Sequence, residues 1–270
     1  MKRLLDRLRE RSVALVSTTI LGAAVAGCGD VGAASAGEAT TGAPGELTTL
    51  TVFAAASLKQ TFTTLGRQFE ASYPGTRVTF NFAGSADLVA QLQQGAPADV
   101  FASADTKNMD RVVADNLVSG TPRDFASNTL EIAVPPDNPA GVSSFQDLMK
   151  PGVQLVVCAP AVPCGSAAAR IEAATGIDLR PVSEESAVTD VLTKVQTGEA
   201  DAGLVYVTDV KGAEGKVRGV PFRESKEAVN RYPIAALSSS KDVDLAQQFA
   251  ELVTGPEGQQ VLADAGFARP

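Results

Sequence analysis

Apolar and polar positions follow two alternating periods along this chain, which predicts an α/β protein. Residues 49–55 and 77–82 are short apolar runs bounded by turn residues, as strands are. Between them, apolar residues recur at helical spacing from Leu58 to about Ser72, and Tyr73-Pro74-Gly75 ends that helix. We therefore expect largely parallel sheets joined by helices, with further strands at 130–134, 153–157, 203–207 and 233–237.

The distribution of these elements predicts two lobes. Residues 127–232 contain their own set of strands and helices, whereas the strand at 233–237 is followed by helical patterns to the C-terminus. We expect lobe I to comprise 47–126 and 233–270, and lobe II to comprise 127–232. Such a pair encloses a cleft that can close by hinge motion. A Rossmann-type cofactor domain is the rival, but no GxGxxG follows the first strand.

The N-terminus indicates export from the cytoplasm. Five basic residues precede a mostly apolar run that ends in Val25-Ala26-Gly27-Cys28, so 1–27 is interpreted as a signal peptide. The ending resembles a lipobox, in which Cys28 receives a lipid and becomes the first residue of a membrane-anchored mature chain. The alternative is an ordinary signal peptide followed by a chance cysteine. Residues 28–46 are small and polar, which predicts a flexible tether.

Charge and cysteine usage narrow the function classes. The whole chain has a net charge of −8, and residues 1–27 carry five Lys+Arg and two Asp+Glu, so the remainder carries −11. Nucleic acid is therefore an improbable partner. Cys158 and Cys164 are close in sequence and are predicted to form a disulfide in an oxidising compartment. A metal site is disfavoured, because the chain has no histidine and two thiols do not complete a zinc shell.

Candidate chemistry lies where strands give way to helices. Ser57 and Ser85 stand at the first two such turns, and Cys164-Gly165-Ser166 opens a later helix. Helix N-termini offer free N–H groups and a positive dipole end, which suit an anion. Tyr206 ends a buried strand in a phenol that can donate a hydrogen bond. The alternatives are that each serine only caps its helix and that the tyrosine only packs.

Several motifs together resemble the molybdate-binding proteins of ABC importers, which belong to the periplasmic binding-protein superfamily. They are AAASL, GAPADVFASAD, VPCGSAAA, GLVYVTD and GPEGQQVLADAGF, and the resemblance covers residues 49–269. It implies a two-lobed α/β fold of type II that holds one tetrahedral oxyanion, molybdate or tungstate, by hydroxyls and main-chain N–H groups. By motif match, the residues that bind it are Ser57, Ser85, Cys164, Val188 and Tyr206.

The same resemblance implies a monomer that is not an enzyme, has no cofactor, and delivers its ligand to an ABC permease. One residue departs from the family pattern, because Cys164 stands where alanine is common. A main-chain donor tolerates that change, and a bond to Cys158 would help to fix it.

Two rival functions remain open at this point. One is a receptor for another solute such as sulfate, an organic anion or ferric iron, although iron calls for clustered tyrosines or carboxylates and the chain has only three tyrosines. The other is a secreted hydrolase that uses Ser57 with Lys59 as its base. Without histidine the usual triad is impossible, and Lys59 is expected to point away from Ser57.

Overall fold

The computed structural model describes residues 47–270. The predicted signal peptide 1–27, the tether 28–46 and the lipid-bearing Cys28 lie outside the described residues and stay predictions. Within the described part, no helix is both long enough and apolar enough to cross a membrane.

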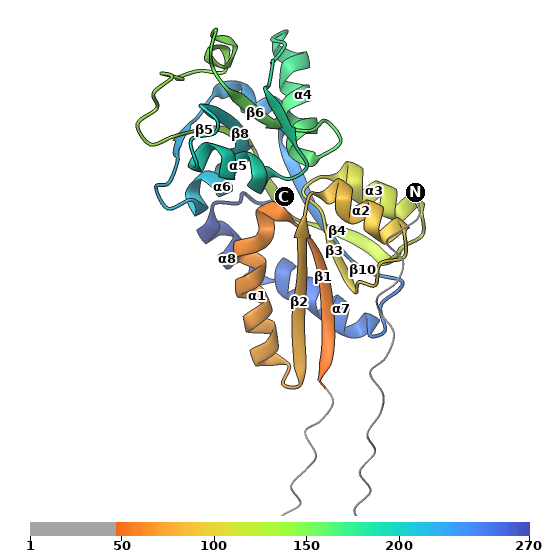
Figure 1. Ribbon diagram of the computed structural model, residues 1–270. Helices are drawn as coiled ribbons and strands as arrows, with labels where there is room; N and C mark the ends of the chain where they lie inside the picture. Colours follow the sequence, from red (N-terminus) through yellow and green to blue (C-terminus); the bar gives the residue numbers. More distant parts are fainter. Residues whose placement is uncertain (1–46) are drawn as a thin grey trace, which may run out of the picture. The chain divides into compact units, whose positions relative to one another are not determined.

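Within residues 47–270, ten strands form two separate five-stranded sheets (Figure 1). The first sheet has the order β2-β1-β3-β10-β4 and the second has the order β7-β6-β8-β5-β9. In chain order, the strands are β1 (Thr48–Ala55), β2 (Thr76–Ala83), β3 (Val100–Ala102), β4 (Val118–Asn128), β5 (Leu130–Val134), β6 (Leu155–Cys158), β7 (Ser183–Glu185), β8 (Ala202–Tyr206), β9 (Arg218–Val220) and β10 (Asn230–Leu237).

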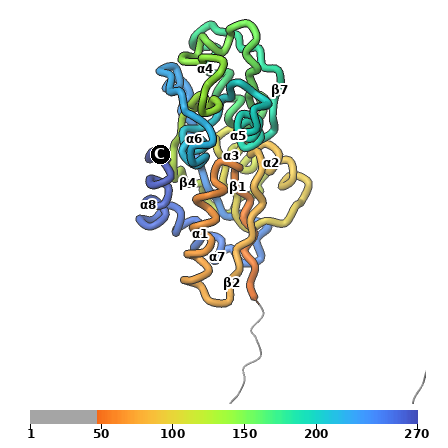
Figure 2. The backbone as a smooth tube through the Cα atoms, turned by 60° about the vertical axis from the view of Figure 1, so that its left-hand side comes forward, coloured from red at the N-terminus to blue at the C-terminus, as the bar shows by residue number. Residues whose placement is uncertain are grey.

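Helices cover both sheets. We call the first sheet with its helices α1, α2, α3, α7 and α8 lobe I, and the second sheet with α4, α5 and α6 lobe II (Figure 2). The α-helices are α1 (Lys59–Ser72), α2 (Ser85–Gln93), α3 (Thr106–Ala114), α4 (Pro163–Thr175), α5 (Val188–Gln196), α6 (Val207–Gly212), α7 (Val243–Thr254) and α8 (Pro256–Ala265). Short 3-10 helices lie at η1 (Ala56–Leu58), η2 (Gln146–Met149) and η3 (Arg223–Ala228).

The expectation of largely parallel sheets is wrong. Strand β1 is parallel to β2 and β3, but β10 is antiparallel to β3 and β4. In lobe II, β6 is parallel to β7 and β8, whereas β5 is antiparallel to β8 and β9. The physical reason is that β4, β5 and β10 carry the chain between lobes, so they do not return through a helical crossover within one sheet.

The sequence pattern also missed the edge strand β4. Its segment VSGTPRDFASN contains a glycine, a proline and several exposed polar residues, which weaken a strand signal but are tolerated at a sheet edge. It runs to Asn128, and β10 begins at Asn230, where the two residues pair. The chain passes between the lobes at Thr129, which joins β4 to β5, and at Val229, which joins η3 to β10; η3 itself packs against α4 of lobe II. The division at 126/127 and 232/233 stays a prediction.

Aromatic packing fixes helix α1 against lobe I. Phe62 and Phe69 are fully buried, and their ring centroids lie 6.0 and 5.3 Å from that of Phe249 on α7. Burying each such ring stabilises the fold by roughly 1.5 to 3 kcal/mol. The expected helix start at Leu58 is a 3-10 turn at Ala56–Leu58 that continues into α1. This packing sets the position of the first turn of α1 at the carboxyl end of β1.

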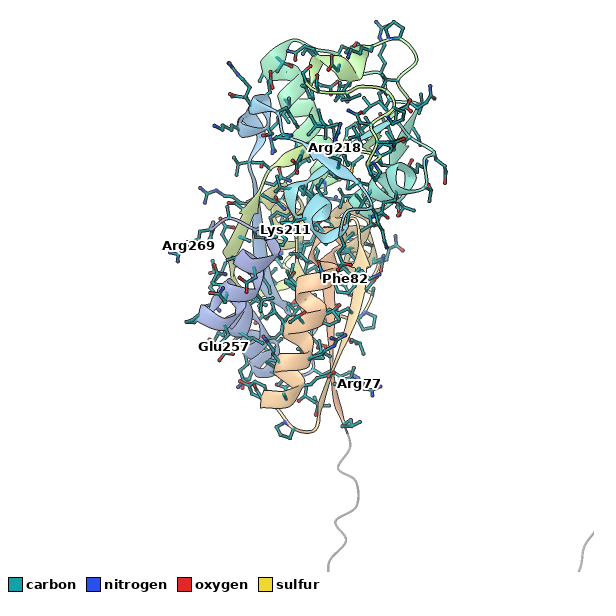
Figure 3. The ribbon with its side chains drawn as sticks, turned by 90° about the vertical axis from the view of Figure 1, so that its left-hand side faces the viewer. Arg77, Phe82, Lys211, Arg218, Glu257 and Arg269 are labelled. Carbon is teal, nitrogen blue, oxygen red and sulfur yellow. A yellow bond between two sulfur atoms is a disulfide. The ribbon has the colours of Figure 1, made fainter. Side chains whose placement is uncertain are left out.

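Polar bonds join the two lobes beside the crossovers. Asn128 at the end of β4 donates through Nδ2 to Thr208 Oγ1 on α6, over 2.8 Å. Lys211, also on α6 and labelled in Figure 3, donates to the main-chain oxygen of Asp264 in α8, over 2.6 Å. In the described part of the chain, every buried side-chain nitrogen or oxygen has a hydrogen-bond partner. The buried polar side chains beside the crossovers are therefore all hydrogen-bonded.

Candidate functional site

Four helical segments begin at one small cavity between the lobes. The segments are η1 and α2 of lobe I and α4 and α5 of lobe II. The space in the cavity is about 10 Å³, far below the roughly 300 to 1,000 Å³ typical of pockets for drug-sized ligands. It therefore suits an occupant of few atoms. Its lining residues are Ala55, Ala56, Ser57, Gly84, Ser85, Ala104, Val162, Pro163, Cys164, Val188 and Tyr206.

The structure thus brings the five sequence-predicted residues, Ser57, Ser85, Cys164, Val188 and Tyr206, to one place. In lobe I this follows from sheet register, because Ala55 pairs with Ala83 and both strands end at the same edge. The helices that follow them must start side by side. The role of the five residues as ligand donors stays a prediction.

Neither serine caps its helix. The residues at the N-cap positions of η1 and α2 are Ala55 and Gly84, and no side chain caps either helix. Ser57 Oγ lies 3.2 Å from Tyr232 Oη. Ser85 Oγ accepts a hydrogen bond from the main-chain N–H of Ala104 over 3.1 Å. Neither hydroxyl therefore accepts a hydrogen bond from the first-turn N–H groups of η1 or α2. Helix geometry also gives these N–H groups no partner within their own helix.

A disulfide braces the start of α4. Cys158 at the end of β6 is bonded to Cys164 in the first turn of α4, with their Cα atoms 5.6 Å apart. Pro163 occupies the first helical position, where its missing N–H costs nothing. Gly165 must lack a side chain, because a Cβ there would overlap the main-chain oxygen of Ala159. The main chain of Cys164 is therefore held from both sides.

Helix α5 presents its first residue to the cavity in the same way. Its N-cap is Ala187, which offers no capping side chain, and Val188 is almost fully buried. The preceding residues form the short strand β7, which is parallel to β6. This strand places the N-terminus of α5 next to that of α4.

Tyr206 closes the cavity with a buried phenol. It is 1% exposed, and its Oη accepts a hydrogen bond from Asn230 Nδ2 over 2.8 Å. Burial, then the nearby Tyr232 and Asp105, raises the pKa of Tyr206 well above its usual range. The main-chain N–H of Tyr206 donates to Asp209 Oδ2 over 2.9 Å, and burial raises the pKa of Asp209 to about 7.

Sequence reasoning missed three residues that shape this site. Tyr232 and Asn230 lie at the predicted crossover and are 0% and 1% exposed. Ala104 lies within the FASAD motif and supplies both a main-chain donor to Ser85 and a main-chain acceptor for Asn230. The available signal was that Asn230 and Tyr232 alternate with the charged Arg231 just before an apolar run, which indicates that both lie on the buried face, where polar groups must find partners.

The electrostatics of the site come from dipoles. Among residues 47–270, the cavity lining contains no charged side chain. The same described range holds no group of three or more His, Cys, Asp or Glu residues placed to bind a metal ion. Hydroxyls and helix N-termini provide hydrogen-bond donors and a positive potential without a fixed cation. The arrangement can therefore hold a small anion.

Known proteins share this sequence and this fold. The model of the family described as bacterial extracellular solute-binding protein matches residues 50–268. The molybdate-binding protein ModA of Mycobacterium tuberculosis strain H37Rv is 50% identical over 259 residues, which cover 96% of this chain and 98% of that protein. ModA of Escherichia coli K12 is 28% identical over 228 residues, covering 81% of this chain and 88% of that protein.

A solved structure shows the same two-lobed fold. The periplasmic molybdate-binding protein of Azotobacter vinelandii superposes with a TM-score of 0.72 at 23% identity, covering 82% of this chain and 99% of that one. At that identity the likeness concerns the fold alone. The family match and the mycobacterial relative together cover nearly the whole chain, so this protein belongs to the family of bacterial extracellular solute-binding proteins.

Proposed function

We propose that this protein captures molybdate in the cavity between its lobes and delivers it to an ABC importer. The observation that carries the proposal is the cavity itself, where four helix N-termini and three hydroxyls meet without a charged side chain. The molybdate-binding relatives support the choice of anion. Tungstate, which has the same charge and shape, is expected to bind in the same place.

Neutral donors suit a receptor that must also release its ligand. A doubly charged oxyanion that leaves water needs several preorganised donors, and charge-assisted hydrogen bonds to it are about twice as strong as neutral ones. The donors proposed here are the hydroxyls of Ser57, Ser85 and Tyr206 and the main-chain N–H groups of Cys164 and Val188. Because no lysine or arginine lines the cavity, no ion pair has to be broken when the anion leaves.

Delivery requires that the lobes separate. Ligand donors are contributed by both lobes, so an anion bound by all of them favours the closed arrangement over an open one. We propose that the crossovers at Thr129 and Val229 are the hinge. The permease would then receive a closed, loaded protein and bind both lobes.

A hydrolytic role for Ser57 lacks a base. The hydroxyl lies 3.2 Å from Tyr232 Oη, and burial raises the pKa of Tyr232 above its usual range, so that phenol keeps its proton. A serine nucleophile needs a positioned group that accepts its proton. We therefore propose a binding protein and not an enzyme. We propose further that it works outside the cytoplasm as a monomer, anchored to the membrane by a lipid on Cys28.

Isothermal titration of the purified protein tests the proposal. Molybdate should bind in a one-to-one complex, tungstate similarly, and sulfate and phosphate much more weakly. A response to sulfate that exceeds the response to molybdate would make this protein a receptor for another oxyanion. No response to any of the four anions would contradict the proposed function.

A further inference from the structure

Three hydroxyl groups from the two lobes form one buried cluster beside the cavity. Ser57 Oγ lies 3.2 Å from Tyr232 Oη, and either atom can be the donor. Tyr232 is also hydrogen-bonded to Tyr206 of lobe II, and the centroids of the two rings lie 5.9 Å apart. Ser57 and Tyr206 line the cavity, whereas Tyr232 is not part of the lining. Tyr232 therefore joins a proposed ligand donor of lobe I to one of lobe II.

Packing fixes the position of Tyr232. The residue is 0% exposed, and its ring meets those of Phe125, Tyr206 and Phe267 edge to face, with centroids 6.2, 5.9 and 5.3 Å away. A buried hydroxyl must find its hydrogen-bond partners where packing leaves it. Replacing Tyr232 with phenylalanine would keep these ring contacts and remove only the hydroxyl.

An asparagine amide donates to the oxygen of each tyrosine. For Tyr232 the donor is Asn128, whose orientation is fixed by its neighbours. Asn128 Oδ1 accepts from the main-chain N–H of Thr129 over 3.0 Å, and that group can only donate. The NH₂ group of Asn128 therefore faces the other way, where it donates to Thr208 Oγ1 and to Tyr232.

For Tyr206 the donor is Asn230, whose Nδ2 lies 2.8 Å from Tyr206 Oη. Arg170 on α4 donates through Nη2 to Asn230 Oδ1 over 2.6 Å, and a guanidinium can only donate. Asn230 Nδ2 also donates to the main-chain oxygen of Ala104 over 2.9 Å, with a longer contact of 3.3 Å to that of Pro163. A turned amide would face its NH₂ to the guanidinium. Both phenol oxygens therefore accept from an amide, and each phenol hydrogen must go to another acceptor.

The number of hydrogens limits what the cluster can offer to a ligand. Each hydroxyl has one hydrogen, and the two bonds Ser57–Tyr232 and Tyr232–Tyr206 use two of the three. If Ser57 donates to Tyr232 and Tyr232 to Tyr206, the hydrogen of Tyr206 is left for the cavity. If the chain of donors runs the other way, the hydrogen of Ser57 is left. An anion that takes both hydrogens leaves Tyr232 with one hydrogen for two bonds, so one bond inside the protein is lost.

We infer that Tyr232 is a positioning residue through which the hydroxyls of Ser57 and Tyr206 compete, so that a bound anion gains the second of these donors only by breaking one hydrogen bond inside the protein. This inference rests on the proposed function, because it concerns the residue that connects two of the proposed donors. Its consequence is a coupling between Ser57 and Tyr206. Removing either donor alone spares the internal bond, so each single loss of affinity is smaller than the lost bond to the anion.

A double-mutant cycle measures this coupling. Ser57→Ala, Tyr206→Phe and the combination of both are titrated with molybdate in a calorimeter, with and without Tyr232→Phe. In the presence of Tyr232, the loss of affinity in the double variant should exceed the product of the two single losses by about 2- to 10-fold, the range for one neutral hydrogen bond. With Tyr232→Phe, the two losses should simply multiply.

Tyr232→Phe alone gives a second readout. Because it frees both hydrogens, it should raise molybdate affinity by about the same 2- to 10-fold, although it deletes a buried hydroxyl. A residue that only supported the fold would instead lower the affinity of every variant by one common factor and leave the coupling in place. That result would overturn the inference.

Ser85 supplies the matched control cycle. Its hydroxyl also lines the cavity, but it accepts from the main-chain N–H of Ala104 over 3.1 Å and shares no hydrogen bond with Tyr232. The losses from Ser85→Ala and Tyr206→Phe should therefore multiply. Coupling of equal size in this cycle would assign the effect to closure of the lobes and overturn the inference. If Tyr232→Phe fails to fold, the comparison of the two cycles still decides between these outcomes.

The proposed function and the inference fail in different ways. If the wild-type protein binds no oxyanion, the proposed function is wrong. If it binds molybdate and the losses from Ser57→Ala and Tyr206→Phe simply multiply, the function stands and the role of Tyr232 is wrong.

Discussion

Gly84 is the position where one added methyl group should oppose closure of the lobes. It is the N-cap of α2, and a Cβ built on it would lie 2.0 Å from the main-chain oxygen of Ser186 in lobe II. Real Cβ atoms essentially never approach closer than 3.0 Å. The backbone angles of Gly84, φ −58° and ψ 139°, are open to alanine. Gly84→Ala therefore introduces no local backbone strain.

The size of the effect follows from that geometry. The lobes would have to stay about 1 Å further apart at this point, or overpack at a cost of about 1 to 3 kcal/mol. Because the cost falls only on the closed arrangement, it lowers molybdate affinity by about 5- to 150-fold. The ligand-free protein should unfold at the same temperature or slightly higher, because replacing glycine restricts the unfolded chain.

The assay is titration calorimetry with molybdate, combined with thermal unfolding in the absence of ligand. Gly212→Ala is the matched control, since its Cβ would also face the other lobe but would meet only the flexible amide of Gln60, at 3.0 Å. That variant should bind molybdate as the wild type does. Wild-type affinity in Gly84→Ala would refute the reasoning, as would a large loss of stability in its ligand-free form.

Three further predictions concern the donors and the buried groups around them. Ser57→Ala and Ser85→Ala should each weaken molybdate binding by about 1.5 to 3 kcal/mol in calorimetry, and unchanged affinity in both would remove them from the site. Changing Cys158 and Cys164 together to serine should lower the free energy of unfolding by about 2 kcal/mol in urea titrations, the value for so short a loop, and should weaken anion binding; unaltered binding would contradict the bracing role. Because burial raises the pKa of Asp209 to about 7, the folded protein holds a proton there that the unfolded chain releases near pH 4. Wild-type stability should therefore fall by up to about 4 kcal/mol relative to Asp209→Asn as pH rises from about 4 to 7, and denaturant titrations with a constant difference across that range would disprove it.

Local patterns predicted the parts of the site that local structure creates. Ser57 and Ser85 could be found because an apolar run, a small residue and a helical pattern follow one another within a few positions. Cys164 was marked by the start of a predicted helix, and Tyr206 by the end of a buried strand. Val188 was found only through the motif resemblance. Its side chain cannot form a hydrogen bond, and the expected donor is its main-chain N–H group.

The missed features all depend on contacts between distant segments. Strand β10 lies between β3 and β4, and no local pattern states that order. The orientation of Asn230 depends on Arg170 and Ala104, which are 60 and 126 positions away. The edge strand β4 is stabilised by pairing with β10 and not by its own composition. The periodicity of apolar residues indicates which positions are buried. It does not indicate which distant segments contact one another, and these features depend on such contacts.

The position of β10 between β3 and β4 also constrains when the protein can fold. Lobe II uses strands from one continuous stretch, β5 to β9, but the sheet of lobe I lacks an interior strand until residues 230–237 exist. Pairings across about a hundred residues, such as Asn128 with Asn230, close large loops and form slowly. During synthesis the first 128 residues therefore cannot complete their sheet.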